Sequence, residues 1–192
     1  MSKIQANQIQ HTQNGAAVFT LPTSDGSSGQ FLKTNASGAL SFGSGGKILQ
    51  YKYKEVSGTT YSTTSSTFQN ISDFDLTVTP TSATSILIIQ VNLRIALWHS
   101  TGNGGNMTVR ISDDNASTYL SDGLVYIYRY DTGGTYWEGT DTQVTSVVAG
   151  STNARTYKLY YKQNDGQMAR INQNNSTNIM DRSSIQVMEV AA

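Results

Sequence analysis

Strict alternation of apolar and polar side chains runs through residues 85–98 and constrains the fold more than any other feature of the chain. Between residues 87 and 97 one parity is aliphatic throughout, at Leu87, Ile89, Val91, Leu93, Ile95 and Leu97, and the other carries Gln90, Asn92 and Arg94. A period of two residues places these sets on opposite faces of a β-strand, so one face belongs to a hydrophobic core. Residues 107–111 repeat the pattern, and the sequence therefore predicts a protein built from half-buried strands.

Shorter apolar runs predict further strands along the chain. We expect them at residues 47–56, 76–79, 124–130, 143–149, 155–162, 167–172 and 184–190, separated by turns rich in Gly, Asn, Asp and Ser. Tyr157, Leu159 and Tyr161 share one parity and are expected in the core. No segment of about ten residues or more holds the helical period of about 3.6 residues, so helix should be almost absent. The sequence predicts an all-β fold, an antiparallel, jelly-roll-like β-sandwich.

The chain changes character near residues 43–46. Residues before this point carry few large apolar groups, and the first of these follow no regular period: Ile4, Ile9, Val18, Phe19 and Leu21. One small β-hairpin is expected there, because residues 30–34, which include Phe31 and Leu32, and residues 39–42 flank an Asn-Ala-Ser-Gly loop. Such a segment cannot bury enough surface to fold alone and should become ordered against a partner. We therefore divide the chain into an extended N-terminal arm with its hairpin, residues 1–46, and a sandwich, residues 47–192.

Charge and composition exclude several classes of function. The 13 Lys and Arg residues balance 13 Asp and Glu residues, which argues against nucleic acid as a partner, because its recognition needs a basic patch. The chain has no cysteine, so disulfides, thiolate metal sites and a cysteine nucleophile are excluded. No run approaches the roughly 18 apolar residues of a membrane span, and no apolar signal region follows Lys3. We expect no membrane insertion and no secretion signal.

Catalytic groups are sparse in the predicted sandwich. His99 is its one histidine, and a loop or surface role explains it better than a role as base for a serine nucleophile. Six carboxylates were considered for paired acid–base chemistry, and we assign them to turns: Asp113, Asp114, Asp122, Asp131, Glu138 and Asp141. Asp113 and Asp114 offer oxygen ligands of the kind Ca²⁺ takes, but they lack the spacing of a calcium loop. We expect no enzyme activity, no catalytic residue and no cofactor.

Aromatic side chains are the remaining candidates for binding. Trp98 and His99 end the long alternating run, and Tyr136 and Trp137 follow the Gly133-Gly134 turn. Exposed aromatic rings of this kind stack on sugars or pack against another protein. The competing interpretation is a cross-strand aromatic ladder inside the sandwich or a subunit interface. We favour the ladder or the subunit interface over ligand binding.

The N-terminal motif resembles a family of phage proteins. The motif consists of Leu21-Pro22, Asp25-Gly26, Gly29-Gln30-Phe31-Leu32 and Leu40-Ser41-Phe42. It is similar to a hairpin motif near the start of bacteriophage fibre and appendage proteins, notably those of marine and cyanobacterial phages. Three later segments also resemble the terminal sandwich of such proteins: residues 46–50, the corner at residues 79–87, and the closing residues 184–190.

The resemblance implies a structural protein of the virion, usually a homotrimer. Residues 1–46 would attach to capsid or tail proteins, with apolar contacts from Ile4, Ile9, Val18, Phe19, Leu21, Phe31 and Leu32, and residues 47–192 would form an exposed knob. Only about four residues join the two parts, which leaves no room for a long shaft. A capsid decoration or cement protein, a short head fibre or a tail-associated knob is therefore expected, with a tail-fibre tip that binds host-surface glycan as the alternative. A polysaccharide hydrolase is the least favoured hypothesis.

Overall fold

The computed structural model of the protein describes residues 8–10, 18–35, 37–43, 48–99, 106–113, 119–126, 135–164, 167–173 and 182–192. Within these ranges, the side chains of residues 10, 98–99, 122, 124–126 and 135–137 lie outside the description. The chain divides into two compact units, Met1–Lys47 and Ile48–Ala192. The described residues contain strands and turns but no helix, as the sequence predicted.

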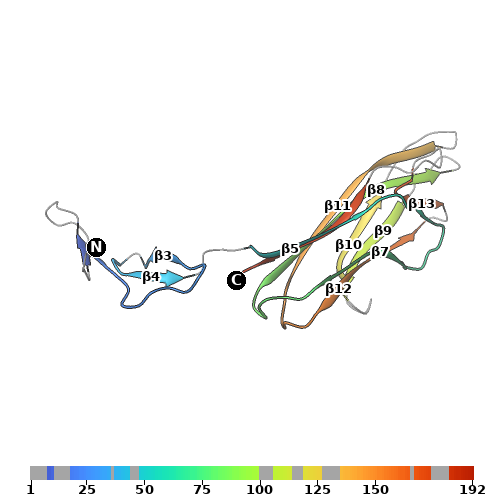
Figure 1. The fold of residues 1–192 in the computed structure, drawn as a ribbon. Helices are drawn as coiled ribbons and strands as arrows, with labels where there is room; N and C mark the ends of the chain where they lie inside the picture. Colours follow the sequence, from blue (N-terminus) through green and yellow to red (C-terminus); the bar gives the residue numbers. More distant parts are fainter. Residues whose placement is uncertain are drawn as a thin grey trace. The chain divides into compact units, whose positions relative to one another are not determined.

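The second unit is a two-sheet antiparallel sandwich (Figure 1). Its strands are β5 (Ile48–Val56), β6 (Tyr61–Thr63), β7 (Gln69–Val78), β8 (Ile86–His99), β9 (Asn106–Asp113), β10 (Tyr119–Tyr126), β11 (Thr135–Val148), β12 (Arg155–Gln163), β13 (Met168–Ile171) and β14 (Ser183–Val190). One sheet has the order β10-β9-β12-β7. In the other sheet, β8 pairs with β11 along one edge. Along its other edge, β8 pairs with β14 and with β13. β14 also pairs with β5, and β13 also pairs with β6.

The order of the eight long strands is that of a jelly roll. One sheet has the order β5-β14-β8-β11 and the other the order β7-β12-β9-β10. When these eight strands are numbered along the chain, leaving out the short β6 and β13, the orders are 1-8-3-6 and 2-7-4-5. This order interleaves two Greek keys, so that the connections repeatedly cross from one sheet to the other. The predicted jelly-roll-like sandwich is therefore confirmed.

The core lies between the two sheets and follows the predicted parity. Leu87, Ile89, Val91, Leu93 and Ile95 of β8 are all buried. Phe74, Met107 and Ile111 face them from the other sheet, together with the buried residues of β12, Tyr157, Leu159 and Tyr161. The assignment of Tyr157, Leu159 and Tyr161 to the core is confirmed, because all three are buried in this cluster.

The sandwich has two distinguishable ends. At one end, which we call the junction end, Ile86 of β8 pairs with Val148 and Val190, and Val190 pairs with Ile48, where the chain leads back to the first unit. At the opposite or distal end, His99 of β8 pairs with Thr135. The chain thus enters and leaves the sandwich at the junction end (Figure 1).

The first unit consists of two small antiparallel pairs. β1 (Gln8–Gln10) pairs with β2 (Val18–Thr20), and β3 (Phe31–Thr34) pairs with β4 (Leu40–Gly43). The β3–β4 pair is the predicted hairpin. Its loop is held by the Asn35 side chain, which accepts hydrogen bonds from the amides of Ser37 and Ala39 at 2.9 and 3.0 Å.

Several strands are longer than the sequence pattern indicated. β7 begins at Gln69 and β11 at Thr135, well before the apolar runs that predicted them, and β1, β2 and β6 were not predicted. The early part of β11 carries Glu138, Thr140 and Asp141, which do not alternate with aliphatic residues. It is a strand because it pairs residue by residue with the long β8. Pairing with a well-formed neighbour supplies hydrogen bonds that local sequence does not reveal.

Candidate functional site

The distal end brings together the backbone positions of the predicted aromatic residues. Trp98 of β8 lies directly opposite Tyr136 of β11, and His99 lies opposite Thr135. Trp137 is one step further along β11, opposite Leu97. The side chains of Trp98, His99, Tyr136 and Trp137 lie outside the described residues, so the register alone is established. It places these positions at the end of the sandwich remote from Ile48.

The arm presents apolar side chains on short strands. Phe31 and Leu32 of β3 are exposed, with Phe31 64% accessible, as are Ile9 of β1 and Phe19 of β2. Val18 and Leu21 are half-buried. Ile4 lies outside the described residues. The described part of this unit contributes no residue to the buried core, which lies wholly within the sandwich.

The N-terminal motif residues hold the arm together locally. A Cβ atom added at Gly26 would approach the ring of Phe42 to 2.5 Å, so glycine lets the chain lie against this aromatic residue. Gly29 has a φ of 83°, which favours glycine, and the next residue, Gln30, accepts a hydrogen bond from the Ser27 amide at 2.7 Å. These residues shape the turn and leave the apolar residues Phe31 and Leu32 on the surface.

Four of the six carboxylates that the sequence assigned to turns lie in strands. Asp122 lies in β10, Glu138 and Asp141 lie in β11, and Asp113 is the last residue of β9. The assignment of these four to loops was therefore wrong, for the reason given for β11: pairing extends strands into polar sequence. Asp114 and Asp131 lie outside the described residues. Among the side chains that the structure describes, no group of three His, Cys, Asp or Glu is placed to hold a metal ion.

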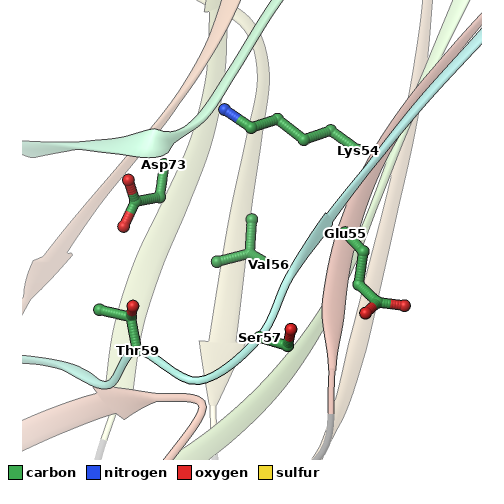
Figure 2. A pocket seen from close by; sticks show the side chains of 6 residues that line it. All are labelled: Lys54, Glu55, Val56, Ser57, Thr59 and Asp73. Carbon is green, nitrogen blue, oxygen red and sulfur yellow. The ribbon is translucent and has the colours of Figure 1, made fainter.

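A shallow polar hollow lies where β5 ends and the chain turns toward β6. It encloses about 280 Å³ and is lined by Lys54, Glu55, Val56, Ser57, Thr59 and Asp73 (Figure 2). Lys54 Nζ donates to the backbone oxygen of Asp75 at 3.1 Å, and Tyr61 donates its phenolic hydrogen to the Asp73 carboxylate. Burial, and then this hydrogen bond, raise the pKa of Tyr61. Lys54 and Asp73 therefore already have hydrogen-bond partners outside the hollow, and the hollow lacks the apolar lining typical of a small-molecule site.

The most elaborate polar site is a buried carboxylate at the junction end. Glu189 of β14 points into the sandwich and is inaccessible to solvent. It accepts hydrogen bonds from Ser85 Oγ at 2.6 Å, from the Thr81 amide at 2.8 Å and from Thr81 Oγ1 at 2.9 Å. The Gln50 side chain donates to the same carboxylate and also to the backbone oxygen of Thr79. Burial alone would raise the pKa of Glu189, but the hydrogen bonds from Ser85, Gln50 and Thr81 lower it to about 2.

Glu189 and its partners Gln50, Thr81 and Ser85, which we call the carboxylate latch, join three segments of the sandwich that are distant in the sequence. Gln50 belongs to the opening segment, Thr81 and Ser85 to the corner, and Glu189 to the closing strand. Those segments therefore serve to hold the fold at the junction end. Sequence reasoning missed the latch, although one signal was present: Glu189 shares the parity of Ile185 and Val187, which is the core-facing parity.

A cationic and aromatic cluster lies on the other sheet. The guanidinium carbon of Arg110 lies 4.0 Å from the ring centre of Phe68 and 4.1 Å from that of Tyr119. Lys162 Nζ lies 5.1 Å from the Phe68 ring centre. Each such contact contributes about 0.5–1 kcal/mol at an exposed site. The cluster ties the chain before β7 to β9 and to the start of β10.

Comparisons with known proteins found distant structural similarity only. No protein-family model and no curated protein matches the chain. A structure of infectious bursal disease virus, Gx strain, aligns with a TM-score of 0.32 and 10% identity over 93% of this chain and 48% of that chain. The VP2 subviral particle of the same virus aligns with a TM-score of 0.34 and 11% identity over 92% and 46%, respectively. A CocE/NonD family hydrolase from Staphylococcus aureus aligns with a TM-score of 0.31 and 8% identity over 96% and 41%.

These similarities carry no argument about function. Viral and hydrolase structures score alike, and this chain spans less than half of each of the three matched chains. Among the described residues there is no helix long and apolar enough to cross a membrane.

Proposed function

We propose that the protein is a structural component of a bacteriophage particle, a short trimeric knob attached by its N-terminal arm. The knob would decorate the capsid as a cement protein or head fibre, or would belong to the tail. Residues 1–46 bind capsid or tail proteins, and residues 47–192 project from the particle. The protein is made in the host cytoplasm, is carried by the virion and performs no catalysis.

The observation that carries this proposal is the contrast between the two units. The sandwich contains an extensive core, whereas the described arm keeps large apolar side chains such as Phe31 and Leu32 exposed. Two short hairpins with exposed apolar residues are marginal in water and gain stability when another surface covers them. The resemblance of residues 21–43 to phage appendage motifs supports a virion protein as that surface.

The geometry of the sandwich supports an outward-facing knob. The chain from the arm enters at Ile48, and the strand ends at His99 and Thr135 lie at the opposite end. Anchoring through the arm leaves the distal strand ends available for exposure.

Particle binding by arm variants tests this proposal. The full chain should co-sediment with phage particles that lack it, and the double variant Phe31→Asp/Leu32→Asp should lose co-sedimentation by at least tenfold, because two charges would be pressed into an apolar contact. Its sandwich should melt as in the unmodified protein. Thr77→Asp, an exposed change on β7, is the control and should bind normally. Equal binding of the arm variant would contradict the anchor assignment, as would binding by a chain that lacks residues 1–46.

A host-surface glycan is the second candidate partner. It is favoured by the β8–β11 register, which places Trp98 opposite Tyr136 at the distal end. Paired aromatic residues at such an end are a common platform for sugar rings. A glycan array probed with the full chain and with Trp98→Ala and Tyr136→Ala tests it. Binding that both substitutions remove supports an adhesin, and absence of binding to any host-surface glycan excludes it.

A further inference from the structure

The outer face of one sheet carries an apolar surface that the core does not use. On the four adjacent strands β5, β14, β8 and β11, the residues that point away from the core form rows across the sheet. The row at the junction end is Ile48, Val190, Ile86 and Val148; the next is Tyr51, Met188, Ile88 and Ser146; the third is Tyr53, Gln186, Gln90 and Val144. We call these three rows the apolar face.

The side chains of the apolar face are accessible to an unusual degree. Ile48, Val144 and Val148 are 58%, 58% and 59% exposed, and Tyr51 and Tyr53 are each about half exposed. No Asp, Glu, Lys or Arg stands in the three rows. The inward parity of the same edge strand, by contrast, carries Lys52 and Lys54. A continuous exposed surface of this kind on a sheet typically marks an interaction site.

Three polar residues of the face, Tyr51, Gln186 and Gln90, are hydrogen-bonded to one another. Tyr51 Oη donates to Gln186 Oε1 at 2.6 Å, and Gln186 Nε2 donates to Gln90 Oε1 at 2.8 Å. Gln90 Nε2 donates in turn to Asn92 Oδ1 at 3.0 Å, just beyond the third row. Covering polar groups costs free energy mainly when they lose water without gaining a partner. This chain of hydrogen bonds across three strands lowers that cost and makes the face suitable for burial.

The extent of the face fits association between protein chains. Four strands at about 4.8 Å spacing and five residues at about 3.4 Å per residue give roughly 19 Å by 17 Å, or about 320 Å² in projection. This is less than the roughly 800 Å² that each partner buries in a standard interface, so the face would form the apolar centre of an interface that extends beyond it. A small ligand would cover only a fraction of it.

We propose that the apolar face binds a second copy of this chain. The three rows have no charge with which to select an acidic or basic partner, and the chain as a whole is neutral. Identical neutral faces that turn toward a common symmetry axis meet without electrostatic repulsion. The inference deepens the proposed trimer and rests on the proposed function only for the number of copies.

The mass of the full chain in solution tests the inference. Light scattering during size-exclusion chromatography should give a multiple of 20.8 kDa for the unmodified protein at micromolar concentration. Tyr51→Lys/Val144→Lys should shift the protein to 20.8 kDa while its melting curve stays cooperative. The control Asn70→Lys/Thr77→Lys adds the same charge to exposed positions of β7 and should keep the larger mass. A monomeric unmodified protein, or a lysine variant of the face that keeps the larger mass, would overturn the inference.

Single cysteines provide a second readout that does not require a disruptive change. Because the chain has no cysteine, Ile88→Cys is the sole thiol in its variant. Ile88 lies on β8, inside the four-strand face, where the same residue of two copies comes closest to a symmetry axis, so this variant should form disulfide-linked dimers under mild oxidation. Thr77→Cys should form no disulfide-linked dimer under the same conditions. Equal cross-linking of the two variants would contradict self-association through this face. Neither measurement uses phage particles. Self-association can therefore be confirmed even if the protein does not bind particles, and particle binding can be confirmed even if the face does not self-associate.

Discussion

At the scale of single residues, Glu189 determines how the sandwich responds to acid. Its pKa is held near 2 in the folded protein, below the ordinary value of 4.5, by hydrogen bonds that need the ionised carboxylate. A lowered folded-state pKa contributes stability above pH 4.5, and this contribution is lost as the pH falls from about 5 toward about 2. We expect the free energy of unfolding to decline over that range in chemical denaturation at a series of pH values.

Glu189→Gln isolates this contribution. The amide keeps the size of the side chain but cannot accept all the hydrogen bonds from Ser85, Thr81 and Gln50. We expect a loss on the order of 2 kcal/mol at neutral pH and a weaker dependence on pH below 5. Glu55→Gln, at an exposed residue paired with Arg182, is the matched control and should change stability by less than about 1 kcal/mol. If both variants behaved alike, the latch would not contribute to stability.

Gly38 is the second residue whose identity the structure requires. Its φ is 84°, and an added Cβ would come within 2.8 Å of the Val18 backbone oxygen. Gly38→Ala should therefore weaken the hydrogen bond from the Thr20 amide to the Gly38 oxygen by displacing β2 from the hairpin. Faster amide hydrogen exchange at Thr20 would show it. Gly58→Ala, with a φ of 75° and open space around it, should leave exchange at Thr20 unchanged.

At the scale of elements, β8 organises the sandwich because it pairs with three other strands. Successive side chains of this strand point alternately into the core and toward the apolar face. Neighbouring residues therefore have entirely different side-chain environments. Ile89→Asp should prevent folding, because an unpaired buried carboxylate costs several kcal/mol, comparable to the total stability of a domain. Gln90→Asp, one residue further and on the outer side, should remain folded. Expression of both variants with circular dichroism measures the difference, and a soluble, natively melting Ile89→Asp protein would contradict the register.

At the scale of the whole molecule, the two units differ in what stabilises them. The sandwich has a buried core drawn from both sheets, whereas the described strands of the arm contribute nothing to that core. Amides of β8, β9 and β14 should therefore exchange only through global unfolding, and those of β3 and β4 should exchange orders of magnitude faster. Hydrogen-exchange mass spectrometry of the full chain measures this. Similar protection in the two units would show that the arm is stabilised beyond its own hairpins.

The sequence determined the class of fold and its core because these depend on local periodicity. Alternation at residues 85–98 identified the buried parity of β8, and the Asn-Ala-Ser-Gly loop identified the β3–β4 hairpin. Both features are encoded within a few neighbouring residues. The same reasoning assigned Glu138 and Asp141 to loops, because the pairing that makes them part of β11 comes from a strand distant in the sequence.

Only the tertiary structure decided which distant residues meet. Gln50, Ser85 and Glu189 form one site although more than thirty residues separate each from the next along the chain. The rows of the apolar face exist only because β5, β14, β8 and β11 are neighbours in an order unrelated to their order in the sequence. Side-chain periodicity specifies what a strand presents on each face, whereas the pairing of strands, set by long-range hydrogen bonds and packing, specifies what those faces become.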